Sequence, residues 1–271
     1  MEIPAFVYGT AWKEERTAEL AALALRAGFR GIDTANQRRH YFEAGVGEAL
    51  EECYRAGVVA RAQLFLQTKF TYRGGQDHRL PYDPAASVGE QVRQSLASSL
   101  EHLRSDYVDS LVLHGPASGR HWTAEDDEAW AAMAAERDAG RARAIGVSNV
   151  GPWHLEAMTA RGAKPAFVQN RCFARFGWDR EVRAFCRENG AAYQGFSLLT
   201  ANVEVLRHPA VTRPAARLGA TTPQVIFAFA RAVGMIPLTG TSDPEHMRQD
   251  LAALELKLAP AEVAAIDQIA G

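Results

Sequence analysis

Strand-like and helix-like segments alternate along the whole chain, and this alternation constrains the fold more than any other feature. The strand-like segments are short and apolar, and longer amphipathic stretches separate them. Such alternation is typical of βα units, in which helices connect successive parallel strands. Eight strands are predicted, at residues 5–9, 31–33, 64–69, 107–114, 143–148, 167–170, 192–197 and 235–239. Together they predict a (β/α)8 barrel, or TIM barrel, formed as a single domain over residues 1–271.

The helical segments are recognised by the spacing of their apolar residues and by their caps. The clearest has one apolar stripe, formed by Val88, Val92, Leu96, Leu100 and Leu103. Thr123 and Asp126 predict a capping box at the start of another helix. Asp179 is predicted to cap a helix that ends near Gly190, and a final helix is predicted over residues 260–269.

Composition argues against several classes of function. The 30 Lys and Arg residues nearly balance the 32 Asp and Glu residues, so no strong field attracts nucleic acid or a membrane surface. The 3 cysteines form no C-x-x-C pair and the 8 histidines show no H-E-x-x-H spacing, so we expect neither a disulfide framework nor a metal site. No signal peptide and no membrane-spanning run is recognised. We therefore expect a cytoplasmic protein that acts on a small molecule.

Three chemically active side chains stand where predicted strands end. Asp33 closes the second strand, Lys69 the third and His114 the fourth. Taken singly, they could be a cap, a solvated lysine and a buried histidine. Together they indicate an active site, because the carboxyl ends of barrel strands converge on one face and carry the catalytic residues there.

Short motifs occur in a fixed order along most of the chain. The first reads G-F-R-G-I-D-T-A at residues 28–35, and it is followed by V-G-E-A-L at 46–50, Q-T-K at 67–69, Y-V-D-S at 107–110, G-V-S-N at 146–149 and V-Q-N at 168–170. In this order and spacing the motifs resemble those of the aldo-keto reductase family. The resemblance implies a barrel enzyme that reduces aldehydes or ketones to alcohols by hydride transfer from NAD(P)H. No G-x-G-x-x-G motif occurs, which agrees with a dinucleotide bound on a barrel instead of a Rossmann sheet.

The resemblance also implies a division of labour in the active site. A tyrosine phenol gives its proton to the carbonyl oxygen as hydride reaches the carbonyl carbon. Lys69 supplies an ammonium that stabilises the phenolate, and Asp33 keeps that ammonium charged and oriented. His114, in its neutral form, hydrogen-bonds the substrate carbonyl and positions it.

The tyrosine is identified from the register of one loop. The commoner family pattern has it five residues after the aspartate, where this chain has Arg38. The loop is two residues longer here, and residues 36–43 resemble a subgroup whose loop reads Q-x-K-H-Y-x-E. This register makes Tyr41 the proton donor, whereas strict gap placement would select His40. Tyr41 is favoured, because neutral imidazole suits a relay with the lysine less well than a phenol does.

A further set of residues would hold a nicotinamide dinucleotide, according to the resemblance. The set is Thr10, Asp33, Ser148, Asn149, Gln169, Phe196, Ser197, Leu199, Thr239, Thr241 and Arg248. Ser148, Asn149 and Gln169 match the trio that binds the carboxamide, and their polar side chains would fix which face of the nicotinamide meets the substrate. Phe196 would stack on the nicotinamide ring.

NADPH is the expected cofactor, with some use of NADH. Relatives commonly hold the 2′-phosphate with a lysine after the eighth strand and an arginine one turn later, whereas this chain has Leu238 and His246. Thr239, Thr241 and Arg248 could still supply hydroxyl donors and one positive charge. We therefore expect a preference for NADPH that is weaker than in most relatives.

The substrate site is expected to be open. Trp12 and His114 are predicted to contact the carbonyl substrate, and Gly115 stands where many relatives have tryptophan. The chain is also expected to stop after its final helix, without the C-terminal loop that covers the substrate in those relatives. This loss of apolar surface favours bulky ketones, α-keto amides or α-keto esters over small aldehydes. We expect a monomer or a weak homodimer.

Two other classes of function compete with carbonyl reduction. A cofactor-binding regulatory or sensor subunit would keep the dinucleotide residues but show little turnover. A barrel lyase or isomerase would use Lys69 as a Schiff-base nucleophile. The complete set of Asp33, Tyr41, Lys69 and His114 argues for catalysis over a sensor role, and the dinucleotide residues would have no purpose in a lyase or isomerase.

Overall fold

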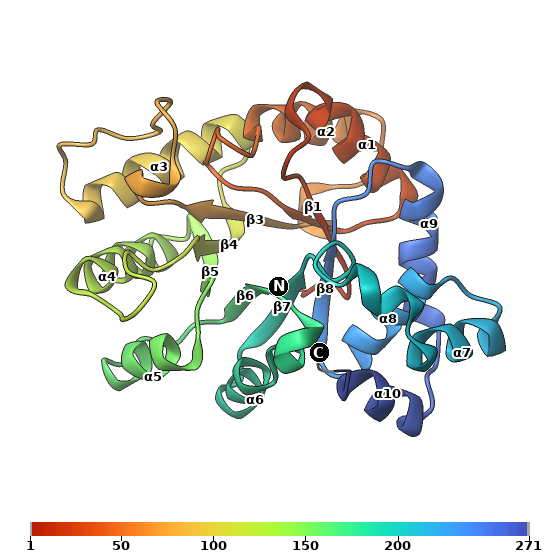
Figure 1. Ribbon diagram of the computed structural model, residues 1–271. Coiled ribbons are helices and arrows are strands. Elements are labelled where there is room, and N and C mark those ends of the chain that lie inside the picture. The colour runs from red at the N-terminus through yellow and green to blue at the C-terminus, as the bar shows by residue number, and fades with distance from the viewer. Residues whose placement is uncertain (1, 270–271) are drawn as a thin grey trace.

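Eight parallel strands close into a barrel in the order in which they occur along the chain (Figure 1). The computed structural model describes residues 2–269. The strands are β1 (Val7–Gly9), β2 (Gly31–Asp33), β3 (Phe65–Phe70), β4 (Val108–Leu113), β5 (Ala142–Ser148), β6 (Phe167–Arg171), β7 (Ala192–Phe196) and β8 (Met235–Thr239). Every predicted strand is confirmed, with ends that shift by no more than two residues. The chain is therefore a (β/α)8 barrel, as the alternating pattern predicted.

Helices follow the strands and surround the barrel (Figure 1). They are α1 (Thr17–Ala27), α2 (Glu43–Arg55), α3 (Val88–Leu103), α4 (Ala124–Asp138), α5 (Pro152–Ala160), α6 (Arg180–Asn189), α7 (Pro209–Leu218), α8 (Thr222–Ala232), α9 (Pro244–Ala252) and α10 (Pro260–Asp267). The predicted capping box at the start of α4 is confirmed. The Thr123 hydroxyl accepts from the Asp126 N–H, and the Asp126 carboxylate accepts from the Thr123 N–H.

The predicted helix cap at Asp179 is wrong. Helix α6 follows Asp179 directly, but this residue has left-handed backbone angles (φ 56°, ψ 39°) and its side chain makes no capping bond. The carboxylate instead accepts hydrogen bonds from Asn170 Nδ2 and Tyr193 Oη, both at 2.8 Å. Burial raises the pKa of this carboxyl group, whereas the two hydrogen bonds lower it. The side chain that the local sequence predicts as a helix cap is thus bound by residues of β6 and β7.

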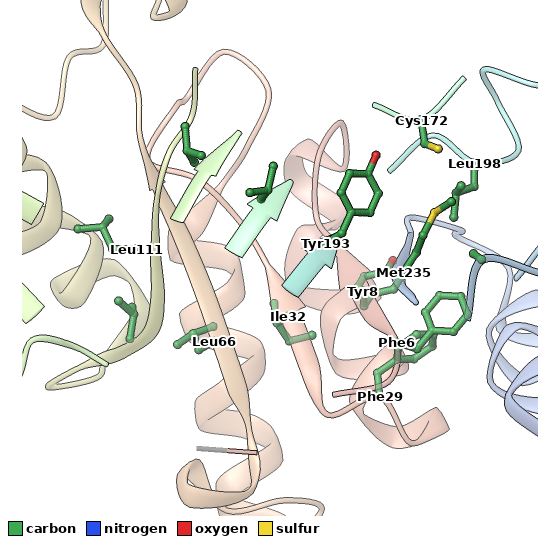
Figure 2. Packing of buried hydrophobic residues seen from close by; sticks show 14 of the residues in the cluster. Phe6, Tyr8, Phe29, Ile32, Leu66, Leu111, Cys172, Tyr193, Leu198 and Met235 are labelled. Carbon is green, nitrogen blue, oxygen red and sulfur yellow. The ribbon is translucent and has the colours of Figure 1, made fainter. Parts of the chain in front are cut away.

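The outer face of the barrel wall packs against the helices. Because side chains alternate along a strand, Ile32, Leu66 and Leu111 share this face, and each is at most 2% exposed. Figure 2 shows part of the outer core, in which the rings of Phe6 and Phe29 meet edge to face with centroids 5.7 Å apart. This burial anchors the strands while leaving the opposite side chains free to fill the barrel.

The inside of the barrel is filled by layers of side chains. Phe65 and Phe167 form an apolar layer, with ring centroids 5.3 Å apart. Gln67 and Gln169 lie two residues further along the same strands and therefore point to the same side. Asp33 is the register partner of Gln67 across β2 and β3. A polar layer thus lies between an apolar floor and the carboxyl ends of the strands, where barrel enzymes carry their active sites.

Two further observations concern the residues that the structure describes. No helix within residues 2–269 is both long and apolar enough to cross a membrane. Cys53, Cys172 and Cys186 are buried free thiols. Burial raises the pKa of Cys172 and of Cys186 to about 12, so these thiols remain protonated and pack as small apolar side chains.

Candidate active site

A buried lysine and a buried aspartate form the centre of the site. Lys69 and Asp33 are only 1% and 3% exposed. Lys69 Nζ donates to the two carboxylate oxygens of Asp33 at 2.7 and 2.6 Å and to the backbone oxygen of Thr34 at 2.8 Å. Burial acts to lower the pKa of Lys69, but the negative charge of Asp33 and the interaction with Tyr41 outweigh it and leave the pKa raised. The lysine therefore stays charged inside the barrel.

Tyr41 lies beside this ion pair, on the loop between β2 and α2. Lys69 Nζ is 5.0 Å from the centre of the Tyr41 ring. The ring meets that of His114 edge to face, with centroids 5.9 Å apart. Burial raises the pKa of the Tyr41 phenol, and the positive charge of Lys69 acts against this rise. The structure thus brings Tyr41, Lys69, Asp33 and His114 together.

His40, the alternative to Tyr41, has a different position. Its ring stacks on the indole of Trp12, with centroids 4.0 Å apart. The backbone N–H of Trp12 donates to the backbone oxygen of His40 at 2.7 Å, which ties the loop after β1 to the loop that carries Tyr41. Burial and the charge of Arg39 lower the pKa of His40. His40 and Trp12 therefore form part of the wall beside Tyr41.

His114 is held neutral and in one orientation. Its backbone N–H donates to the backbone oxygen of Phe70 at 2.8 Å, and its Nδ1 lies 2.7 Å from Thr71 Oγ1. Burial first, and then the positive charge of Lys69, lower the pKa of His114 to about 3. A neutral imidazole bound at Nδ1 has Nε2 left for a ligand.

Three glutamine amides adjoin Asp33 inside the barrel, and we call Gln67, Gln169 and Gln194 the glutamine layer. The Nε2 atoms of Gln67 and Gln169 donate to Asp33 Oδ1 at 2.7 and 3.0 Å. The same two nitrogens donate to Gln194 Oε1 at 2.8 and 2.9 Å. Gln194 Nε2 donates back to Gln67 Oε1 at 3.1 Å. The buried carboxylate is thus bound by one ammonium and two amides, which satisfies its charge.

A cavity of about 860 Å³ adjoins these residues. This volume suits a sizeable small molecule or cofactor. The predicted residues that line it are Trp12, Asp33, Tyr41, His114, Ser148, Gln169, Phe196, Ser197, Leu199, Thr239 and Thr241. Residues from the loops after β1, β2, β4, β7 and β8 therefore share one cavity. Within the described residues, no group of three or more His, Cys, Asp or Glu side chains could hold a metal ion.

Two predicted cofactor residues support the cavity without lining it. Thr10 is fully buried, and its hydroxyl donates to the backbone oxygen of Asp33 at 3.0 Å. Asn149 Nδ2 donates to the backbone oxygen of His114 at 2.7 Å and to Ser148 Oγ at 3.1 Å. The Thr10 side chain thus holds the backbone of Asp33, and the Asn149 side chain holds the backbone of His114.

The cation expected near β8 is also absent from the lining, and a carboxyl group is present instead. Arg248 is exposed and forms an ion pair with Glu245. Asp250, on the same helix α9, lines the cavity, is 4% exposed and accepts from Thr239 Oγ1 at 2.8 Å. Burial raises the pKa of Asp250 to about 6. Near neutral pH the Asp250 carboxyl group is therefore largely ionised.

Several residues of the site were missed by the sequence interpretation: Thr71, Gln67, Gln194, Asp250 and Lys13. Lys13 lines the cavity, and its Nζ donates to the backbone oxygen of Gly240. A signal existed for Gln67, because it has the same strand parity as Lys69 and must point inward with it. No comparable signal existed for Asp250 or Thr71, whose roles depend on partners in other elements.

Comparison with known proteins agrees with this geometry. The family model for the aldo/keto reductase family matches residues 6–270. Over 261 residues the chain is 30% identical to methylglyoxal reductase DkgB of Escherichia coli O157:H7, covering 95% of this chain and 90% of the relative.

Solved structures have the same architecture. An aldo/keto reductase from Brucella melitensis is 26% identical, with a TM-score of 0.81 over 98% of this chain and 95% of that one. A Bombyx mori aldo-keto reductase in complex with NADP is 23% identical, with a TM-score of 0.82 over 99% of this chain and 89% of that one. The protein therefore belongs to the aldo/keto reductase family and is an oxidoreductase that reduces carbonyl compounds.

Proposed function

We propose that the protein reduces ketones with NADPH and that Tyr41 donates the proton. One observation carries the proposal: the Lys69 ammonium, fixed by Asp33, lies 5.0 Å from the centre of the Tyr41 ring. A fixed positive charge stabilises the phenolate that remains after proton transfer, so Tyr41 is the group best suited to act as the acid. His114, with a pKa of about 3, is not protonated near neutral pH and cannot replace it.

Each side chain then has one task. A reduced nicotinamide, when bound, would supply the hydride that the carbonyl carbon takes up. The carbonyl oxygen takes the proton of the Tyr41 hydroxyl, and the phenolate is stabilised by Lys69 until solvent returns the proton. Thr71 Oγ1 lies 2.7 Å from His114 Nδ1; in the tautomer in which the Thr71 hydroxyl donates to Nδ1, the Nε2–H can donate to the carbonyl oxygen and hold it near Tyr41.

The cavity has features that fit a nicotinamide dinucleotide. No described residue donates a hydrogen bond to Gln169 Oε1, so this atom can accept from the carboxamide. Phe196 lines the cavity with a half-buried ring on which the nicotinamide can stack. Ser197 has a positive φ of 58°, and Leu198 and Leu199, which follow it, line the cavity. Backbone N–H groups in such a turn can bind a pyrophosphate.

The open side of the cavity favours bulky ketones, α-keto amides or α-keto esters. A Cβ built on Gly115 would meet Asn149 Cβ at 3.7 Å, an ordinary contact distance, so the glycine leaves room for a side chain next to His114. No residue between 251 and 269 lines the cavity. A large apolar substituent can fill this space and gain roughly 25 cal/mol for each Å² removed from water. A short aldehyde lacks that surface.

Initial rates of NADPH oxidation with a panel of carbonyl compounds test the proposal. The panel contains an aryl ketone, an α-keto ester, an α-keto amide, a short aliphatic aldehyde and methylglyoxal, which names the activity of the Escherichia coli relative. We expect the highest kcat/KM for the bulky compounds. Equal or higher values for the two small compounds would contradict the proposed substrate class. Tight NADPH binding without any turnover would favour a regulatory subunit.

A Schiff-base mechanism would require an uncharged Lys69. A nucleophilic lysine must lose its proton, but the pKa of Lys69 is raised by Asp33 and Tyr41 despite burial. We therefore expect borohydride to trap no substrate adduct on Lys69. A borohydride-stable adduct on this residue, found by mass spectrometry, would support a lyase or isomerase instead.

A further inference from the structure

We infer that Gln194, together with Gln67, is a positioning residue that fixes the orientation of the Gln169 amide toward the cofactor. This inference rests on the proposed binding of a nicotinamide cofactor. Both residues are fully buried, and neither is among the described residues that line the cavity. They can therefore influence a ligand only through the groups that they contact, which are Gln169 and Asp33.

The Gln169 amide cannot turn over, with its oxygen and nitrogen exchanged, without losing hydrogen bonds. Its Nε2 lies 3.0 Å from Asp33 Oδ1 and 2.9 Å from Gln194 Oε1. Turning the amide over would bring its carbonyl oxygen against a carboxylate oxygen and a second carbonyl oxygen, and neither can donate a hydrogen bond. Both N–H hydrogens are thus used inside the barrel. Only Oε1 remains for the cavity that Gln169 lines.

Gln194 is in turn held by Gln67. The two amides form a reciprocal pair, in which Gln67 Nε2 donates to Gln194 Oε1 at 2.8 Å and Gln194 Nε2 donates to Gln67 Oε1 at 3.1 Å. The other contact of Gln67 Nε2 is with Asp33 Oδ1 at 2.7 Å. The charge of Asp33 therefore orients every amide in the glutamine layer. The carboxylate that fixes the Lys69 ammonium also determines that Gln169 presents an acceptor to the cofactor.

An acceptor at this position distinguishes two closely related cofactors. The nicotinamide carboxamide can donate an N–H to Gln169 Oε1, whereas the 3-acetylpyridine analogue has a methyl group in place of the NH₂. The analogue would leave the buried oxygen unpaired. Loss of one buried hydrogen bond of this kind corresponds to about tenfold in affinity. Removing a hydrogen bond that holds the Gln169 amide should reduce the difference in affinity between the two cofactors.

The experiment measures dissociation constants for oxidised NADP and for its 3-acetylpyridine analogue by quenching of protein fluorescence. In the wild type we expect the analogue to bind about tenfold more weakly. In Gln194→Met, the Gln169 amide keeps only its contact with Asp33. The dissociation constant of the analogue divided by that of oxidised NADP should therefore fall by at least about threefold. Phe65→Leu is the control, because it loosens the apolar layer below without removing a polar group, and its ratio should match the wild type.

The outcomes separate positioning from general damage. If Gln194→Met weakens both ligands by the same factor, Gln194 has only a structural role and the inference is wrong. Gln67→Met provides a second variant should Gln194→Met fail to fold; an unchanged ratio in that variant would likewise overturn the inference. If the wild type binds oxidised NADP but does not discriminate against the analogue, the inference fails while the proposed function stands. If the wild type binds neither ligand, both fail.

Discussion

Lys69 Nζ contacts both carboxylate oxygens of Asp33, and the two side chains are almost completely buried. Such a pair is costly to remove from water, and it is retained here with Tyr41 on one side and the glutamine layer on the other. The same pair therefore serves two neighbours. It presents a positive charge to the phenol and a negative charge to the amides.

Removing one partner of the ion pair should destabilise the fold more than removing both partners. Lys69→Met leaves the Asp33 carboxylate buried without its cation and should lower the free energy of unfolding by about 3–5 kcal/mol. The double variant Asp33→Asn with Lys69→Met removes both charges and should lose less. Urea denaturation of the wild type, both single variants and the double variant measures the coupling. Additive losses would contradict the paired role.

His114 should remain neutral across the physiological range. Its folded-state pKa of about 3 lies below the ordinary value of ~6.5, so the folded protein resists protonation that the unfolded chain accepts. His114 therefore costs stability as pH falls from about 6.5 towards 3, and costs nothing above that window. NMR of the imidazole signal, identified by its loss in His114→Gln, should show no titration between about pH 5 and 8. A midpoint near 6.5 would contradict this prediction.

Asp250 should weaken the preference for NADPH. It accepts a hydrogen bond from Thr239, which is predicted to contact the 2′-phosphate, so carboxylate and phosphate would repel each other. Asp250→Asn should tighten NADPH binding roughly tenfold and alter NADH binding by less than about threefold. With a pKa of about 6, the wild-type carboxyl group is charged above that pH, so the gain should be larger at about pH 8 than at about pH 5.

The matched control for Asp250 is Glu245→Gln, on the same helix. Glu245 is exposed, pairs with Arg248 and is not among the described residues that line the cavity. Its neutralisation should leave the dissociation constants of both cofactors nearly unchanged. Equal effects of the two variants would indicate a general change in surface charge instead of a local contact.

Filling the space beside His114 should change the substrate range. A Cβ at Gly115 would meet its neighbours only at ordinary contact distance, so Gly115→Trp should fold and place an indole next to His114, which lines the cavity. We expect kcat/KM for an aryl ketone or α-keto ester to fall at least about tenfold, while that for a short aldehyde is kept or improved. Gly115→Ala is the control and should behave like the wild type. Unchanged turnover of bulky ketones in Gly115→Trp would refute the open-site account.

The fold could be read from the sequence because each strand carries its own signal. An apolar run such as that of β3 and the apolar stripe of α3 are local patterns that the barrel then uses without change. Asp179 was misread for the opposite reason. Its position before a helix predicts a cap, but Asn170 and Tyr193 bind its carboxylate. Neither contact can be predicted from the local sequence.

The site could be predicted only in part. Asp33, Lys69 and His114 are recognisable because they end strands that must converge. Gln67 was noted only as part of the Q-T-K motif and Gln194 only as part of a strand, although alternation places Gln67 on the inner face with Lys69. Arg248 is predicted to bind the cofactor, and in the structure its exposed side chain pairs with Glu245.

Deuteride transfer to an α-keto ester shows whether Tyr41 is the proton donor. With NADPH that carries two deuterium atoms at the nicotinamide C4, the wild type should yield an alcohol with one deuterium on the former carbonyl carbon. Tyr41→Phe should lower kcat for this transfer at least ~100-fold and leave the dissociation constant of NADPH nearly unchanged, because only the proton donor is lost. His40→Ala should stay active. If Tyr41→Phe transfers deuteride at the wild-type rate while His40→Ala is inactive, Tyr41 is not the proton donor and the account is wrong.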